Sequence, residues 1–215
     1  ETFAASALIV SAVLGVLVMA VHPHGHELRD AIDGPAMVSR NRVVHALAIA
    51  AMLLQTSGAV ALVSAVSRGR VGLGHLAFVA QGAAAAAVTI AAVCSGFVLP
   101  QFLDDTRMTA FVFAFNQAFA KTFVIAAGTA IAAWSVAGWR RALPTVTSGL
   151  GVVVGGITAA MVAFGHLRLD VHGMGAVVLG HSVWWVLGAI GMLRRRARCA
   201  RNTQPCPRSA LPPTC

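Results

Sequence analysis

Six apolar runs, separated by short breaks that contain charges, proline or glycine, limit what this chain can fold into more than any other feature. They lie near residues 3–22, 43–66, 72–100, 108–138, 146–165 and 173–193. A helix needs about 20 predominantly apolar residues to cross a bilayer, and lipid offers no partners for the backbone of an open strand. The sequence therefore predicts an all-α, polytopic membrane protein: one bundle of six transmembrane helices over residues 1–193.

The first run needs a separate argument, because an apolar segment at an amino terminus resembles a signal peptide. "FAASALIVSAVLGVLVMAVHPHG" has no basic flank before it and is longer than the usual apolar region of a signal peptide. We therefore interpret it as a membrane-spanning helix. At 58% hydrophobic residues overall, the chain has the composition of a membrane protein throughout.

Arginine is distributed unevenly between the two ends of such a bundle. Ten of the 16 basic residues fall on one face: Arg68, Arg70, Arg140, Arg141, Arg194, Arg195, Arg196, Arg198, Arg201 and Arg208. The positive-inside rule assigns this face to the cytoplasm, so we expect both termini to be cytoplasmic. The positive charge then reflects topology and a basic tail, residues 194–215, which we expect to be disordered and to contact membrane lipid rather than nucleic acid.

The eight histidines show the opposite asymmetry. Seven are expected in the outer half of the bundle: His22, His24, His26, His45, His166, His172 and His181. Only His75 belongs to the inner half. A diheme cytochrome that carries electrons across the bilayer needs two histidine pairs at different depths, so this class is excluded. A single outer heme b held by His45 and His181 remains an alternative.

The outer histidines also have the spacing of metal ligands. Segments "HPHGH" and "DVH" place imidazole and carboxylate groups two residues apart in chain that we expect to be non-helical. Such groups bind divalent transition metals, here Cu, Zn or Fe. The predicted ligands are His22, His24, His26, His45, His166, Asp170 and His172. The alternative is that these histidines are amphipathic residues at the membrane interface.

Span four contains a lysine far from either predicted end. Lys121 lies about 13 residues, or roughly 20 Å, from the outer end of its span, where a charged lysine costs at least about 2.5 kcal/mol. Gln117 precedes it by one helical turn, and Asn116 is adjacent to Gln117. We predict a polar cleft that runs from the outer histidines to Lys121, with these three as candidate catalytic residues. Hydrogen bonds between helices are the alternative role for the amides.

Small residues indicate close helix contacts. Gly151 and Gly155 form a GxxxG pair, and span three contains "GAAAAAV". Residues without bulky side chains let two helix backbones approach each other in a membrane.

Three segments resemble a known group of proteins. "NQAFAKTF" at 116–123, "GHLRLDVHG" at 165–173 and the "VHP" turn after the first span are similar to segments of uncharacterised small bacterial inner-membrane proteins with six helices. The resemblance covers most of the chain up to about residue 193. It implies a bacterial six-helix bundle in the inner membrane and brings no catalytic residue with it.

Together these features predict an inner-membrane protein with a periplasm-facing metal site and a polar cleft. Such a site would serve a metal-dependent oxidoreductase or hydrolase that acts on a small lipid-soluble or anionic ligand. One alternative is a transporter or binding subunit for a metal ion or small anion. A single-heme electron-transfer subunit is the other. Whether the protein is an enzyme stays open at this stage.

Overall fold

A computed structural model describes residues 2–23, 34–66, 71–140 and 142–201 of the 215-residue chain. The described residues form six long helices, α1 (Thr2–Ala20), α3 (Gly34–Val66), α4 (Val71–Val93), α5 (Thr106–Gly138), α6 (Thr145–Ala163) and α7 (Val171–Arg201). A π-helical turn, Cys94–Val98, and a 3-10 turn, Leu99–Gln101, extend α4. Within the described ranges, six helical segments are long and apolar enough to cross a membrane, which confirms the predicted all-α class.

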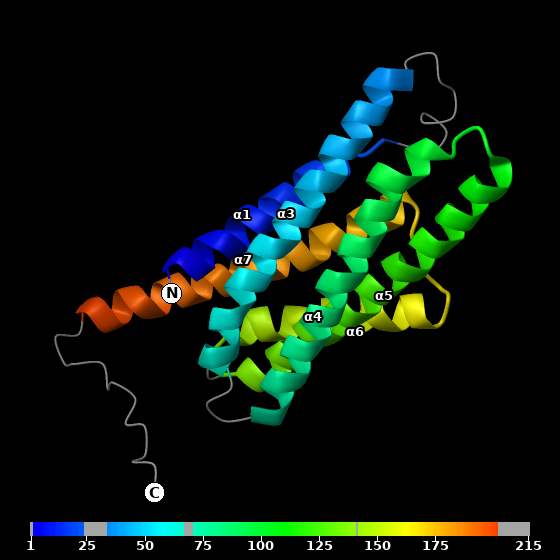
Figure 1. Cartoon of the computed structure of the whole chain (residues 1–215). Coiled ribbons are helices and arrows are strands. Elements are labelled where there is room, and N and C mark those ends of the chain that lie inside the picture. Colours follow the sequence, from blue (N-terminus) through cyan, green and yellow to red (C-terminus); the bar gives the residue numbers. More distant parts are fainter. Residues whose placement is uncertain (1, 24–33, 67–70, 141, 202–215) are drawn as a thin grey trace, which may run out of the picture.

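The helices are arranged as a ring in sequence order. Each helix contacts the next one along the chain, and α7 contacts α1, which closes the ring (Figure 1). The start of α1 and the end of α7 lie at one end of the bundle, which we call the terminal end. The opposite end is formed by the end of α1, the start of α3, the α4–α5 turn and the α6–α7 turn. We call it the histidine end.

Two helices are longer than the sequence predicts. Helix α3 begins at Gly34, nine residues before the predicted start at 43. Helix α7 continues to Arg201, so residues 194–201 of the expected disordered tail are helical, whereas residues 202–215 lie outside the described part of the chain. Arginine and alanine have high helix propensity, and each residue added to an existing helix gains a hydrogen bond without a new nucleation step. Hydropathy alone therefore gives the wrong start for α3 and the wrong end for α7.

Helices α5 and α6 meet through glycine. A Cβ atom added to Gly128 would lie 2.5 Å from the carbonyl oxygen of Gly155, and one added to Gly155 would lie 2.5 Å from the carbonyl oxygen of Gly128. The two backbones thus touch where neither helix carries a side chain. Gly151, one turn away on α6, faces Ser135 and Trp184 in the same way. The contact predicted from the GxxxG pair is confirmed.

Three tryptophans fill the ring toward the terminal end. Trp134 of α5 lies parallel to Trp184 of α7 with ring centroids 6.4 Å apart, and Trp185 meets both rings edge to face. All three side chains are buried. Because they come from facing helices, they close the middle of the bundle on this side of the molecule.

Candidate functional site

A cavity of about 390 Å³ lies inside the ring of helices. Its lining comes from α1, α3, α5 and α7, together with α4 and the turns that extend it. Along α5 the lining runs from Phe113 to Ala127, which is about 21 Å of helix. Phe113 and Asp170 at one end are exposed, whereas Ala127 and Trp185 at the other end are buried. The cavity is therefore reached from the histidine end and ends against the tryptophan cluster.

The structure separates the residues singled out from the sequence into three groups. Six line the cavity: His22, His45, Asn116, Gln117, Asp170 and His181. The side chains of His166, His172 and Lys121 are exposed. His24 and His26 lie outside the described residues.

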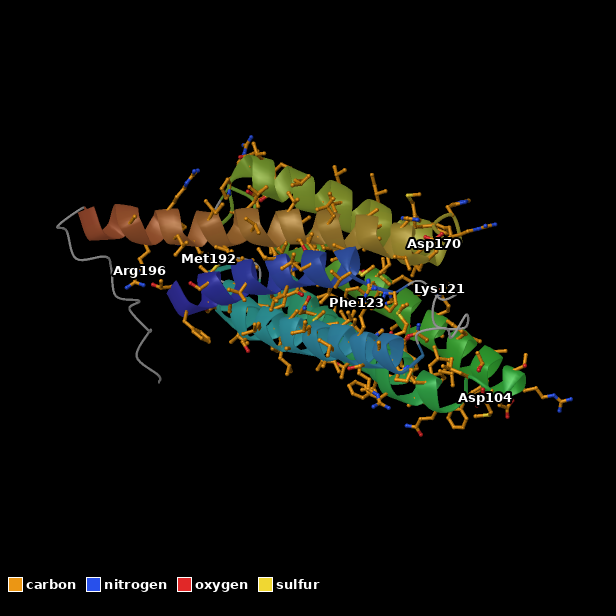
Figure 2. The ribbon with its side chains drawn as sticks, turned by 90° about the horizontal axis from the view of Figure 1, so that it is seen from above. Asp104, Lys121, Phe123, Asp170, Met192 and Arg196 are labelled. Atoms are coloured by element: carbon orange, nitrogen blue, oxygen red, sulfur yellow. The ribbon has the colours of Figure 1, made fainter. Side chains whose placement is uncertain are left out.

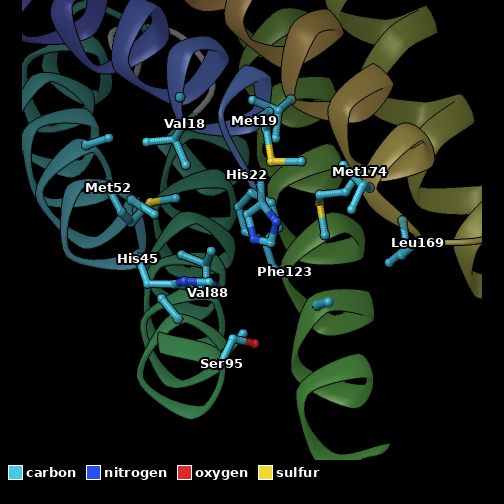
Figure 3. A pocket seen from close by; sticks show the side chains of 18 of the residues that line it. Val18, Met19, His22, His45, Met52, Val88, Ser95, Phe123, Leu169 and Met174 are labelled. Carbon is cyan, nitrogen blue, oxygen red and sulfur yellow. The ribbon is translucent and has the colours of Figure 1, made fainter. Parts of the chain in front are cut away.

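His22 and His45 form a pair at the histidine end of the cavity (Figure 3). Their rings meet edge to face with centroids 5.0 Å apart. The Nδ1 atom of His45 is 2.8 Å from the carbonyl oxygen of Asn41, and Nδ1 of His22 is 2.9 Å from that of Pro23. A carbonyl oxygen only accepts, so both Nδ1 atoms carry the proton and the lone pair of each neutral ring is on Nε2.

The π-helical turn at the end of α4 supports this pair. A π-helical carbonyl accepts from the residue five positions on, but the residue five positions beyond Ser95 is Pro100, which has no N–H. The side-chain amide of Asn41 donates to Ser95 O instead, at 2.7 Å. A Cβ on Gly96 would lie 2.6 Å from the Cβ of His45, so glycine is required where the turn meets the imidazole.

His181 has the opposite tautomer. Its Nε2 atom is 3.1 Å from the hydroxyl of Thr158 on α6. That hydroxyl is also 2.8 Å from the carbonyl oxygen of Val154, which takes its only proton. Nε2 of His181 must therefore donate, which leaves the lone pair of the neutral ring on Nδ1.

The depths of His45 and His181 argue against one shared heme. Ser182, the neighbour of His181, donates to Ala12 O of α1 at 3.2 Å. His45 packs instead on His22, which lies ten residues after Ala12. The two histidines are thus about 15 Å apart along the bundle. Nε2 of His181 is also engaged by the Thr158 hydroxyl. These hydrogen bonds and depths do not support the heme pair proposed from the sequence.

The segment "GHLRLDVHG" is a tight turn between two helices. Gly165 has φ +74° and follows the last turn of α6, where the N–H of His166 donates to Met161 O and that of Gly165 to Val162 O. This is the Schellman pattern of a helix end. Asp170 then caps α7, since its Oδ1 accepts from the N–H of Gly173 at 2.8 Å. Helix termination explains Gly165, and capping of α7 explains Asp170, which we had interpreted as a metal ligand.

The metal site predicted from imidazoles and carboxylates is not supported by the described part of the chain. There, no three His, Cys, Asp or Glu side chains come close enough to hold an ion. Two predicted ligands, His166 and His172, are exposed, and Asp170 caps a helix. These three residues belong to the α6–α7 turn and the first turn of α7, whereas His22 follows α1 and His45 lies on α3.

The predicted extension of the cleft to Lys121 is not observed. Its side chain is exposed on α5, outside the lining of the cavity. Gln117 donates to the carbonyl oxygen of Leu169 at 3.2 Å, so this level of α5 coincides with the α6–α7 turn. Lys121 is one turn, about 6 Å, further along. Figure 2 shows it at the same end as Asp104 and Asp170. The first turns of α5 extend beyond the α6–α7 turn, so Lys121 lies nearer to that turn than to the start of α5.

Sequence reasoning missed part of the lining. Asn41 is buried and holds the π-helical turn, and three methionines, Met19, Met52 and Met174, also line the cavity. Asn41 precedes His45 by one helical turn, so it shares a helix face with that histidine, and this spacing was a usable signal. The methionines gave no signal, because methionine is an ordinary residue of an apolar span.

These features define an integral membrane bundle with an internal, histidine-containing cavity. No protein-family model, curated protein or solved structure matches the chain.

Proposed function

We propose that this protein binds a small lipid-soluble molecule in the cavity of the six-helix bundle. The observation that supports the proposal is the cavity itself: about 390 Å³, lined mainly by alkyl and aromatic side chains, with a small number of polar groups. Binding sites for small molecules have this composition, because apolar walls supply affinity and a few polar groups fix orientation.

The polar groups would bind a ligand with oxygen or nitrogen at both ends. Asn116 and Gln117 lie toward the histidine end of the lining, and His181 lies near the closed end. Amide groups both donate and accept, and the neutral ring of His181 accepts through Nδ1. A ligand with a hydroxyl or carbonyl group near each end and an apolar body between them fits this distribution.

Binding is favoured over transport by the closed end of the cavity. A carrier for a metal ion or small anion needs a path to the opposite side of the membrane. Here that path would pass Trp134, Trp184 and Trp185, which are buried and pack on one another. Transport would require this cluster to open.

An enzymatic role requires a reactive group beside the ligand. An oxidoreductase or hydrolase of the kind expected from the sequence would use a metal ion for this purpose. His22 and His45 are the residues of the cavity that would bring such an ion next to the ligand.

We further propose that the histidine end faces the periplasm of a bacterial cell. The support is the concentration of arginine at the terminal end of the bundle, which the positive-inside rule assigns to the cytoplasm. With the native cysteines replaced by serine, His166→Cys is expected to react with a membrane-impermeant maleimide in intact spheroplasts. Arg195→Cys is expected to react only after lysis. The reverse pattern would contradict this orientation.

Ligand binding is tested by filling the cavity. Ala120 lines the cavity, while Ala118 on the same helix is exposed. We expect native mass spectrometry and solvent extraction of the protein in nanodiscs to detect a bound lipid-soluble molecule. Ala120→Phe should remove it and the control Ala118→Phe should retain it. Equal amounts in both variants, or none in the wild type, would disprove the proposal.

A further inference from the structure

The serine hydroxyls at the closed end of the cavity have already used their protons. Ser11 on α1 donates its proton to Leu8 O at 2.9 Å, and Ser182 on α7 donates its proton to Ala12 O at 3.2 Å. Both serines are buried and line the cavity. A hydroxyl group has one proton and two lone pairs, so each of these oxygens can only accept a further hydrogen bond.

His181 adds an acceptor at the same level of the bundle. It is next to Ser182 in the sequence and is 5% exposed. Its Nε2 atom faces Thr158 on α6, a helix that has no residue in the lining, and among the described residues this is the hydrogen bond of the ring. The two nitrogens of an imidazole point in nearly opposite directions, so Nδ1 faces away from α6, toward the cavity that His181 lines. Because Nε2 has the proton, Nδ1 presents a lone pair.

Thr158 fixes which nitrogen of His181 has the proton. The Thr158 hydroxyl is 2.8 Å from Val154 O and 3.2 Å from Gly155 O, so the α6 backbone takes its proton and the oxygen accepts from Nε2. Thr158 is not part of the lining and therefore acts on the cavity through the ring of His181. The lone pair on Nδ1 is thus set by a residue of a neighbouring helix.

One group at this level can donate to a ligand. Gln55 of α3 lines the cavity with an amide that both donates and accepts. Its level follows from the contact between Gly58 and Leu8, because three residues toward the histidine end on these antiparallel helices lead to Gln55 and Ser11. Trp185 also lines the cavity, but its Nε1 atom is enclosed by protein, so the cavity meets carbon atoms of the indole.

A hydroxyl group suits this end of the cavity better than a carbonyl or an ammonium group. A hydroxyl donates to Nδ1 of His181 and accepts from Gln55, whereas a carbonyl oxygen has no proton and would face lone pairs. An ammonium group would bring a charge to the closed end. The carboxylate of the lining, Asp170, lies at the histidine end (Figure 2), and a buried charge without a partner is costly.

We infer that the inner end of the bound molecule is a hydroxyl group that donates to Nδ1 of His181, so the cavity selects a lipid-soluble alcohol over the corresponding ketone. Thr158 is a positioning residue for this selection. The inference rests on the proposed binding of a lipid-soluble molecule and narrows the class of that molecule. The outer end makes no such choice, since the amide of Asn116 both donates and accepts.

A matched alcohol and ketone test the selection. Protein in detergent is equilibrated with dodecane-2,11-diol and dodecane-2,11-dione together, and each bound probe is extracted and measured by mass spectrometry relative to its free concentration. We expect the diol to be preferred by at least about fivefold, since an unpaired buried hydrogen-bonding group weakens binding by that much or more. His181→Phe keeps an aromatic ring without the acceptor and should remove the preference.

Thr158→Val tests the positioning role. Valine keeps the branched shape but does not accept from Nε2, so the proton can move to Nδ1 and the preference for the diol should fall. Nitrogen-15 NMR of labelled histidine, with His181→Phe to assign the ring, should show more protonation at Nδ1. Thr129→Val is the matched control, because this exposed hydroxyl bonds to Ile125 O and has no histidine beside it. It should keep the wild-type ratio.

The outcomes separate this inference from the binding proposal. Equal binding of the two probes, preference for the dione, or a wild-type ratio in folded Thr158→Val would overturn the selection of a hydroxyl group. The cavity would still be a binding site if Ala120→Phe removed both probes. Probe binding that Ala120→Phe does not reduce, or no binding of either probe to the wild type, would disprove the proposed binding and this inference with it. The wild-type ratio keeps the test valid if Thr158→Val does not fold.

Discussion

The side-chain amide of Asn41 donates a hydrogen bond to the carbonyl oxygen of Ser95, at 2.7 Å, across two helices. The acceptor is available because Pro100 has no N–H to complete the π-helical turn. Asn41 also precedes His45 on α3 by one turn and provides the carbonyl that accepts from its ring. One residue thus joins α3 to α4 and orients a histidine of the cavity.

Asn41→Asp is therefore expected to destabilise the protein. The carboxylate has no proton to donate to Ser95 O, so a buried acceptor loses its partner, which costs about 1–3 kcal/mol. Thermal unfolding in detergent, followed by circular dichroism, measures the loss. Gln101→Glu is the matched control, since its amide bonds to Phe97 O at an exposed position. Similar melting temperatures for the two variants would refute the role of Asn41.

Gly128→Ala and Gly156→Ala are expected to have opposite effects. At Gly128 the new Cβ would meet the backbone oxygen of Gly155, which has no side chain to move aside, so overpacking should cost about 1–3 kcal/mol. At Gly156 nothing lies within 4 Å, and alanine in a helix interior should stabilise by about 0.5–1 kcal/mol. Unfolding temperatures of the two variants check the sign. A neutral Gly128→Ala would mean that α5 and α6 are not in backbone contact.

Substitutions of Asp170 separate capping from metal binding. Asp170→Ala removes the bond to the N–H of Gly173 and should cost about 1 kcal/mol, while Asp170→Asn keeps an accepting oxygen and should unfold at nearly the wild-type temperature. Neither change should lower the number of metal ions bound per chain, as determined by elemental analysis. A loss of bound metal in both variants would restore the carboxylate to a metal site.

Lys121→Met tests whether this lysine lies outside the cavity, as its absence from the lining indicates. Because the side chain is exposed and outside the cavity lining, the substitution should leave the amount of bound lipid-soluble molecule unchanged, as measured by native mass spectrometry. A side chain near the α6–α7 turn would reach the membrane interface with its four-carbon stem, so insertion should also be unaffected. Loss of the bound molecule would show that Lys121 contributes to the cavity after all.

The sequence alone determined the class of fold and several contacts. Six apolar runs require six helices in lipid, because a backbone without water must satisfy its own hydrogen bonds. The small residues around Gly155 predicted a close helix contact, since a helix surface without bulky side chains lets any neighbouring helix approach its backbone. His22, His45, Asn116, Gln117 and His181 were also identified as candidate site residues, and all five line the cavity.

Only the tertiary structure decided which of these residues meet. Counting residues from the start of a span gives depth only if all helices begin at one plane. Here α5 extends past the α6–α7 turn, so residue counts from the start of α5 do not give the level of Lys121 relative to α7. His45 was expected beside His181 in a heme pair or beside the other predicted metal ligands, His22 among them, and of these it meets His22, because α1 and α3 are neighbours in the ring. Hydropathy reports how far a residue lies from water, whereas a site depends on rotation and neighbour order, and packing between helices fixes both.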